Sequence, residues 1–384
     1  TQADQLVRQA CQATAQRLKT LPPQHVRACL QALSSLADAI APTQARQVLL
    51  AAAGSGLDLE ALCGRSGQDW CARLKSRLAP AGFEIVEEKP PALPEQKSGD
   101  PYGLVFENRN ARELFLVMPR KIRAVKGLFS DSIRPVFLLV PGGQIYFPDD
   151  EGNTRTLRNE KPFYLAATET SWDALTSFYR GLSEAQRNNL VMDKSAINIL
   201  ANPSSRMLGA PASFARGSFI SSFCAWLNSK RSSAGDQESL TLALNAAQGD
   251  KLDLATKEQW QFAACLDLLA RAQQEKAQPS YEWWKSARIE AQWDAGTLRE
   301  SASADPEGWG FCHLFGNVAE LVRLSSNSAK MRRCGGSYME ASSSISSFPL
   351  YDREAREGLL DLGFRLVLLP GFDAEWAASK GDMP

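Results

Sequence analysis

The sequence predicts an α+β protein in which a small helical domain precedes a larger mixed domain. Apolar residues recur at three- and four-residue spacing through residues 1–80, which is typical of amphipathic helices. Short runs rich in Val, Ile, Leu and Phe, typical of strands, begin at residue 83. Residues 280–370 are rich in Ser and Gly and hold only short strand-like runs, which indicates long loops. The length of 384 residues suits two domains better than one.

The expected domain boundaries follow these changes of pattern. In the first domain, Pro22 and Pro23 separate the first two helices, and Thr43 is expected to cap a third. A last helix ends before Pro80. The predicted parts are a helical domain at 1–82, a short β region and linker at 83–132, the mixed domain at 133–372 and a tail at 373–384.

Several short segments of the middle region read as strands. Residues 83–86, 102–106 and 114–118 are strand-like, with a turn expected at 108–112 between the last two. Residues 136–140 and 144–147 flank the turn-forming sequence Pro141-Gly142-Gly143, which predicts a hairpin.

Three helices are expected in the mixed domain. Ser171 is placed to cap a helix at 172–180, and Thr256 is placed to cap one at 257–273. Residues 218–228 form an amphipathic helical pattern between them.

Composition and charge exclude several classes of protein. The chain has 43 basic and 43 acidic residues and no long run of like charge, so nothing indicates binding to nucleic acid or to a membrane surface. No run of 18 apolar residues is present, so we expect no transmembrane segment.

Eight cysteines divide evenly between the two halves of the chain. An even number in each half would let each domain form two disulfides, which favours an oxidising compartment: a periplasmic or otherwise secreted protein. A chain that begins at Thr1 fits removal of a signal peptide as well as cloning. The alternative is eight buried thiols that behave as small hydrophobic residues. The cysteines are Cys11, Cys29, Cys63, Cys71, Cys224, Cys265, Cys312 and Cys334.

Seven short motifs occur in order over the mixed domain. The most informative are Gly-Asn-Val-Ala-Glu at 316–320, Gly-Gly-Ser-Tyr at 335–338 and Gly-Phe-Arg at 363–365. The others lie at 137–147, 163–171, 223–227 and 254–263. Together they resemble the formylglycine-generating enzyme family, also called the sulfatase-modifying factor domain. The resemblance covers residues 133–370 and implies a C-type-lectin-like fold, with a short twisted sheet, two helices and long ordered loops.

The resemblance also shows where this chain departs from the family's enzymes. Those enzymes hold copper through two cysteines that follow the Gly-Gly-Ser motif. Here the two positions hold Glu340 and Ile345, and no cysteine follows Cys334. Another branch of the family binds iron through several histidines, whereas this chain has only His25 and His313. We therefore expect neither copper nor iron and no enzyme activity of the family's kind.

Calcium is the one cofactor that the resemblance leaves open. Family members hold a calcium ion around the Gly-Asn-x-x-Glu loop, which implies Gly316, Val318 and Glu320 as ligands here. Calcium takes six to eight oxygen ligands, so water or neighbouring carbonyls would have to complete the site. The alternative is that Glu320 makes only local contacts.

The candidate binding residues lie around the family's cleft. Trp283, Trp284 and Trp309 would form a recognition surface if exposed, or would hold the loops in place if buried. Glu340 and Ser343 lie in the segment where the family's cleft is expected.

These observations predict a non-catalytic regulatory protein of the bacterial periplasm that binds a protein partner. A family member of this description promotes the activation of a membrane-bound Ser/Thr kinase that controls type VI secretion, which implies the periplasmic sensor region of such a kinase as the partner. One alternative is a lectin-like binder of glycans or peptidoglycan. The other is a divergent enzyme that uses Glu340, Arg356 or Arg365 in the cleft.

Overall fold

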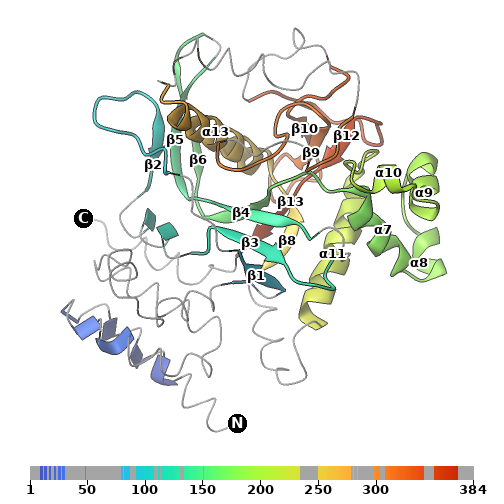
Figure 1. Ribbon diagram of the computed structural model, residues 1–384, viewed down its shortest axis with the longest axis horizontal. Coiled ribbons are helices and arrows are strands. Elements are labelled where there is room, and N and C mark those ends of the chain that lie inside the picture. The colour runs from blue at the N-terminus through green and yellow to red at the C-terminus, as the bar shows by residue number, and fades with distance from the viewer. Residues whose placement is uncertain are drawn as a thin grey trace.

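A computed structural model shows three sheets with helices packed around them (Figure 1). With short gaps, it describes residues 79–129, 134–149, 151–233, 250–277, 280, 283, 298–302, 308–340 and 350–370, together with single positions between 9 and 30 and at 48. The strands are β1 (Phe83–Ile85), β2 (Gly103–Val105), β3 (Lys121–Ala124), β4 (Val136–Val140), β5 (Gly143–Pro148), β6 (Thr154–Asn159), β7 (Phe163–Ala166), β8 (Lys251–Leu254), β9 (Ala319–Arg323), β10 (Met331–Cys334), β11 (Asp352–Glu354), β12 (Leu362–Phe364) and β13 (Leu366–Leu369). The helices are α7 (Trp172–Arg180), α8 (Glu184–Asn188), α9 (Lys194–Ala201), α10 (Ser205–Leu208), α11 (Gly217–Ser233) and α13 (Lys257–Gln274). This mixed architecture confirms the predicted α+β class.

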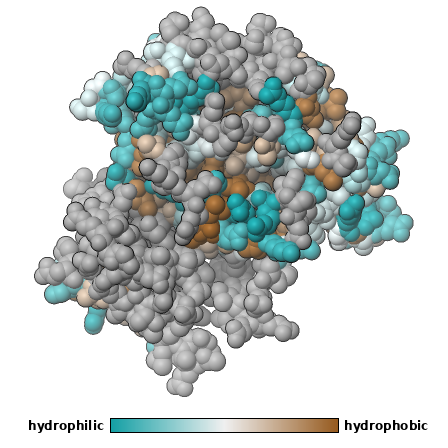
Figure 2. Space-filling model, viewed as in Figure 1, coloured by the Kyte–Doolittle hydropathy of each residue, from teal (hydrophilic) through white to brown (hydrophobic). Residues whose placement is uncertain are grey.

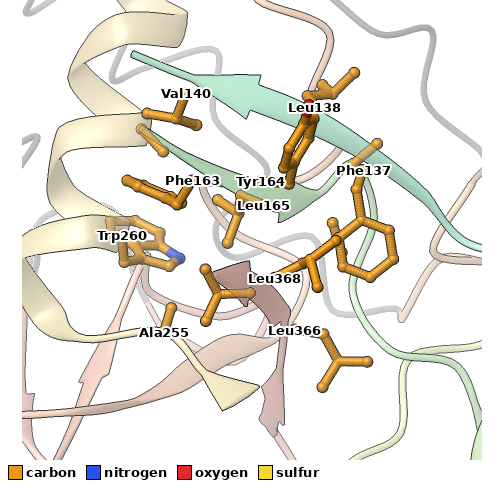
Figure 3. Close-up of a cluster of buried hydrophobic side chains, with 14 of the residues drawn as sticks. Phe137, Leu138, Val140, Phe163, Tyr164, Leu165, Ala255, Trp260, Leu366 and Leu368 are labelled. Carbon is orange, nitrogen blue, oxygen red and sulfur yellow. The ribbon is translucent and has the colours of Figure 1, made fainter. Parts of the chain in front are cut away.

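The largest sheet has the strand order β1-β3-β4-β7-β13-β8, with antiparallel pairing between all neighbours. Its middle strands β4 and β7 are continuous apolar runs that are almost entirely buried, as expected for strands covered on both faces. Figure 3 shows their side chains packed with Leu366 and Leu368 of β13 and Trp260 of α13. The core of the molecule therefore lies at this sheet.

Two smaller sheets make up the rest of the β structure among the described residues. One has the order β11-β10-β9-β12, in which β9 and β12 run parallel and the other neighbours antiparallel. The other has the order β2-β5-β6 and is antiparallel. β6 carries mostly exposed polar residues, which suits its position at an edge.

The segment at 83–124 contributes strands to two of these sheets. β1 and β3 extend the largest sheet beside β4, and β2 pairs with β5. The short β region therefore forms part of the mixed domain's sheets.

The three predicted helices are confirmed, and two of them cover strands. α13 packs against β5 and β6, and α11 packs against β8. Thr256 caps α13 as predicted: its hydroxyl accepts a hydrogen bond from the Gln259 backbone at 3.2 Å, and the Gln259 side chain accepts one from the Thr256 backbone at 3.0 Å. Ser171 stands at the start of α7, but its side chain makes no capping hydrogen bond, contrary to the prediction.

Two predictions for the β region are wrong. β4 and β5 do not pair as a hairpin; each belongs to a different sheet. The chain leaves one sheet for the other at Gly143, where φ is +143° and an added Cβ would lie 2.5 Å from the Val105 carbonyl oxygen. The expected strand at 114–118 is also wrong, because Phe115 and Leu116 are helical. A short apolar run does not distinguish a strand from a buried helix.

The described positions of the N-terminal region agree with the helical prediction. Between residues 9 and 30 they are helical except Leu21 and Pro22, where the break between two helices was expected. Cys11, Leu18, Val26 and Leu30 are buried there. Thr43 and the expected last helix at 67–78 lie outside the described residues.

One face of the molecule is mixed in polarity. Figure 2 shows hydrophobic residues near the middle of this face, around β3 and β4, and hydrophilic residues over α8 and α9. Among the described helices, none combines the length and the apolar composition that crossing a membrane requires.

We predict that Tyr164→Phe destabilises the protein, because the Tyr164 hydroxyl is fully buried and donates to the Pro119 carbonyl at 2.8 Å. Loss of the donor leaves that carbonyl without this partner and should lower the free energy of unfolding by about 1–3 kcal/mol in urea titrations. The control is Tyr146→Phe, whose hydroxyl bonds the partly exposed Gln144 side chain. An equal effect of the two changes would contradict the prediction.

Candidate functional site

A buried ion pair lies where the three C-terminal motifs meet. Arg365 donates from Nε and from a terminal nitrogen to Glu320 Oε1 at 3.0 and 2.8 Å. Trp260 donates its indole N–H to Glu320 Oε2 at 2.7 Å. All three side chains are at most 1% exposed. The carboxyl group of Glu320 is therefore enclosed and hydrogen bonded at both oxygens.

The other donors of Arg365 hold two neighbouring chain segments. Its terminal nitrogens donate to the carbonyls of Ala166, at the end of β7, and Cys312, in the loop before β9, at 2.9 and 2.8 Å. One guanidinium thus joins the largest sheet, β9 and the loop at 312. Charged hydrogen bonds of this kind are strong where water is excluded.

A second buried carboxyl lies beside this pair. Glu169 is 2% exposed, and both of its oxygens accept from the Asn317 amide, at 3.0 and 3.1 Å. Burial raises the pKa of Glu169 well above its ordinary value, and the charge of Arg365 opposes that rise. Asn317 has φ of +53°, a left-handed conformation that asparagine tolerates better than most residues.

The glycines of the motifs bring their segments into close contact. The Gly316 N–H donates to the Gly335 carbonyl at 3.0 Å. Gly335 has φ of +86°, and an added Cβ would lie 2.6 Å from the Leu314 carbonyl oxygen and 3.1 Å from the Trp260 ring. Only glycine fits this position. The series of motifs is therefore a set of contacts around one buried centre.

The geometry around Glu320 gives no support to the predicted calcium site. As a calcium ligand, Glu320 would have to turn away from Arg365 and Trp260, which occupy both of its oxygens. Gly316 and Val318 lie in the same loop, and Val318 is buried. Among the described residues, no group of three or more His, Cys, Asp or Glu is arranged to hold a metal ion. Calcium binding stays an untested prediction.

Glu340, at the position of the family's first cysteine, is enclosed by cations and a phenol. Its Oε1 contacts the Arg333 guanidinium and accepts from the Tyr351 hydroxyl at 3.0 Å, while Arg353 lies 3.7 Å away. Burial and the nearby Glu340 charge raise the pKa of Tyr351 to about 12, so this phenol stays protonated. The other oxygen, Oε2, is buried and has no hydrogen-bond partner.

Two exposed apolar residues lie close in sequence to members of this ion cluster. Ser337 is buried and donates to Asp361 Oδ2 at 2.6 Å. Met339 and Leu360, each close in sequence to one member of that bond, are 60% and 50% exposed. We refer to Met339 and Leu360 as the apolar rim.

Of the two alternatives for the tryptophans, the buried one holds for Trp309. It is 4% exposed and donates its indole N–H to the Leu139 carbonyl at 2.9 Å. Trp283 is half-buried against the core and donates to Glu275 at 2.9 Å. Trp284, Ser343 and Ile345 lie outside the described residues.

Two of the residues expected for a divergent enzyme lie in different environments. Arg365 cannot contact a substrate, because it is buried and bonded as described above. Arg356 is exposed.

His313 is almost fully buried with φ of +53°, and burial lowers its pKa to about 4, so it is neutral at pH 7.

The predicted disulfides of the second half are also wrong. Cys224, Cys265 and Cys334 are buried thiols outside any disulfide, so the four cysteines of this half cannot form two bonds. Burial raises the pKa of Cys224 to about 12 and keeps it unreactive. In the first half, Cys11 and Cys29 form no disulfide either, while Cys63 and Cys71 lie outside the described residues.

Several residues of the site were missed by sequence reasoning. Arg333 and Tyr351 come from β10 and from the start of the β11 segment, and Asp361 from the turn before β12. Strand pairing brings them to Glu340, with Arg333 opposite Arg353. The only signal in the sequence was a charged residue at a position where the family has cysteine.

Comparison with known proteins assigns most of the chain to a family. A family model described as "Sulfatase-modifying factor enzyme 1-like domain" matches residues 128–369. None of the curated proteins matches.

Three of the solved structures that match the chain have low sequence identity to it. "Treponema denticola variable protein 1" matches at 14% identity and a TM-score of 0.41, over 66% of this chain and 100% of its own. "Crystal Structure of CarF" matches at 16% identity and a TM-score of 0.38, over 60% and 98%. "Structure of PvdO from Pseudomonas aeruginosa" matches at 14% identity and a TM-score of 0.39, over 61% and 94%.

We predict that Glu320→Gln is strongly destabilising, because it leaves the buried Arg365 charge without its anion. The free energy of unfolding should fall by about 3–5 kcal/mol in urea titrations. The matched control is Glu84→Gln, which removes the exposed pair with Arg134 and should cost at most about 1 kcal/mol. If the two variants unfold at the same urea concentration, the central role assigned to this ion pair is wrong.

Proposed function

Because the chain belongs to the sulfatase-modifying factor enzyme 1-like domain family, we propose that it is a non-catalytic member that regulates by binding another protein. The observation that carries the proposal is the environment of Glu340. In place of a thiolate, a carboxylate is held there by Arg333 and Tyr351. A hard oxygen ligand already paired with a guanidinium is unsuited to a copper ion, which favours thiolates.

The ion cluster also supports a structural use of the former cleft. Arg333 lies 3.8 Å from Asp361 as well as against Glu340, so one guanidinium links two carboxylates. Asp361 is in turn bonded to Ser337 of the Gly-Gly-Ser motif. These contacts fix the segment that carries Met339 and the turn that carries Leu360. The apolar rim is thereby presented on a rigid base, which lowers the entropic cost of binding a partner.

The proposed partner is the periplasmic sensor region of a membrane-bound Ser/Thr kinase that controls type VI secretion, whose activation this protein would promote. This part of the proposal rests on the resemblance of the motifs and on the replaced cysteine positions. The periplasmic location is also a proposal, and it no longer draws support from disulfides in the second half of the chain. Cell fractionation with an antibody to the protein would test it.

The glycan-binding alternative is weakened by the position of the aromatic residues. It required exposed tryptophans along a polar groove, and Trp309 is buried. The enzyme alternative loses Arg365 for the same reason.

We predict that Met339→Asp and Leu360→Asp each weaken binding to the purified kinase sensor region by about tenfold or more, because each places a charge in an apolar contact. Biolayer interferometry measures the dissociation constants. The matched control is Val191→Asp, since Val191 is also 60% exposed but lies between α8 and α9. Equal affinity of all three variants would remove the apolar rim from the proposal, and no binding by the unaltered protein would remove this partner.

We also predict that the protein does not convert the cysteine of a sulfatase peptide to formylglycine, with or without added Cu⁺, because position 340 offers no thiolate. Mass spectrometry of the peptide detects the product. A family enzyme with both cysteines serves as the positive control. Formylglycine formation, with copper retained by the protein, would overturn the non-catalytic assignment.

A further inference from the structure

The sheet that contains β9, β10 and β11 has two faces with different surroundings. On one face, Arg332 donates to Asp352 at 2.5 Å, and Lys257 of α13 lies 3.9 Å from the same carboxyl group. This is the face that α13 covers, since α13 contacts both β9 and β10 (Figure 1). Arg333 and Arg353 stand directly opposite each other, one position further along their strands. Because side chains alternate along a strand, these two arginines lie on the other face.

The charges on this second face balance in number but differ in exposure. Arg333 contacts Glu340 and lies 3.8 Å from Asp361, while Arg353 lies 3.7 Å from Glu340. Opposed arginines repel each other, and the two carboxyl groups offset that repulsion. The side chains of Glu340 and Asp361 are only 11% and 10% exposed, and that of Arg333 is 11% exposed. The side chain of Arg353 is 50% exposed, so a molecule that approaches this face meets a cation.

Other exposed charges close to this face do not reverse its sign. Glu354 stands opposite Arg332, which places it on the face that α13 covers. Arg356 and Glu357 follow in the chain towards Leu360, and their charges are opposite. Glu357 also accepts a hydrogen bond from the Gly217 N–H at 3.2 Å.

The Arg353 guanidinium is oriented by an aromatic ring. It lies over the ring of Tyr351, 5.1 Å from the ring centroid, and the Tyr351 hydroxyl is fixed by its bond to Glu340 at 3.0 Å. The contact of Arg353 with Glu340 is longer than a hydrogen bond. Arg353 makes a further contact in the fold, yet half of its side chain stays open to solvent. A planar guanidinium held in this way suits a carboxylate, which it can bind through two parallel N–H donors.

The apolar rim lies beside this cation. The Glu340 N–H donates to the Ser337 carbonyl at 3.0 Å, which closes a tight turn with Met339 at its exposed end. Glu340 directly follows Met339, and its carboxyl group contacts Arg353. An exposed apolar side chain and an exposed guanidinium are therefore joined through one residue.

We propose that the apolar rim and Arg353 together recognise a segment of the partner protein in which an Asp or Glu lies within about three residues of a large apolar side chain. The carboxylate binds the Arg353 guanidinium, and the apolar side chain contacts Met339 and Leu360. Recognition of this kind rests on the proposed binding of a protein at the rim, to which it adds the charge of the bound segment.

The test is the selection of short random peptides, displayed on phage, against the immobilised full chain. Selection against Met339→Asp, run in parallel, identifies the peptides whose binding needs the rim. We expect those peptides to carry Asp or Glu close to a large apolar residue. The dissociation constant of the tightest one, measured by fluorescence anisotropy, should rise about tenfold when its acidic residue is changed to the amide.

Reversing the charge of Arg353 separates recognition from a structural role. Selection against Arg353→Glu should yield Lys or Arg where the unaltered protein selects an acidic residue, an exchange that a merely destabilised protein would not produce. Arg353→Gln should weaken the acidic peptide about tenfold and its amide form far less. The matched control is Arg155→Glu, because the Arg155 side chain is 61% exposed and pairs with a carboxyl group, that of Asp149, which is 14% exposed. It should select the same peptides as the unaltered protein.

The outcomes distinguish this inference from the proposed function beneath it. Peptides that need Met339 but show no acidic preference, or that keep the same preference with Arg353→Glu and the same affinity with Arg353→Gln, would overturn the role of Arg353 and leave the rim as a binding surface. If the unaltered protein selects no peptides beyond those of Met339→Asp, both the rim and the role of Arg353 are wrong. Melting temperatures of all variants establish that each is folded under the conditions of selection.

Discussion

The contact between Arg365 and Glu320 is the constraint on which the rest of the mixed domain depends. Taking two charges out of water is costly, and such a pair persists only when the remaining donors and acceptors are also satisfied. Here Trp260 of α13 and the carbonyls of Ala166 and Cys312 complete the set. Helix, sheet and loops must therefore reach their places together, because any one of them out of place would leave a buried polar group unpaired.

Much of the fold could be predicted from local patterns. The periodicity of α13 and the cap at Thr256 are properties of adjacent residues, and the structure reproduces both. The hairpin at β4 and β5 failed because the sequence at Pro141-Gly142-Gly143 specifies a turn but not which strands pair after it. The strand expected at 114–118 failed because Phe115 is buried against Trp309, a contact between distant parts of the chain.

The candidate site was predictable only in part, for a related reason. Comparison of motifs predicts that Glu340 stands where the family's enzymes carry a copper ligand, but its contacts with Arg333 and Tyr351 require two strands to be in register. Likewise, the motif alone does not reveal that Glu320, expected as a calcium ligand, pairs with Arg365, which lies 45 residues away in the sequence. Residue types indicate what a side chain is able to do, whereas partners distant in sequence decide which of those roles is realised.

The position of β13 has a consequence for biosynthesis. This strand lies between β7 and β8 in the largest sheet, and β12, just before it, completes the sheet of β9. Until residues 362–369 have left the ribosome, β8 has no neighbour in the largest sheet and Glu320 has no guanidinium partner. Closure of the domain therefore waits until residues 362–369 have been synthesised, and a nascent chain that stalls before residue 362 would expose apolar strands to chaperones and proteases.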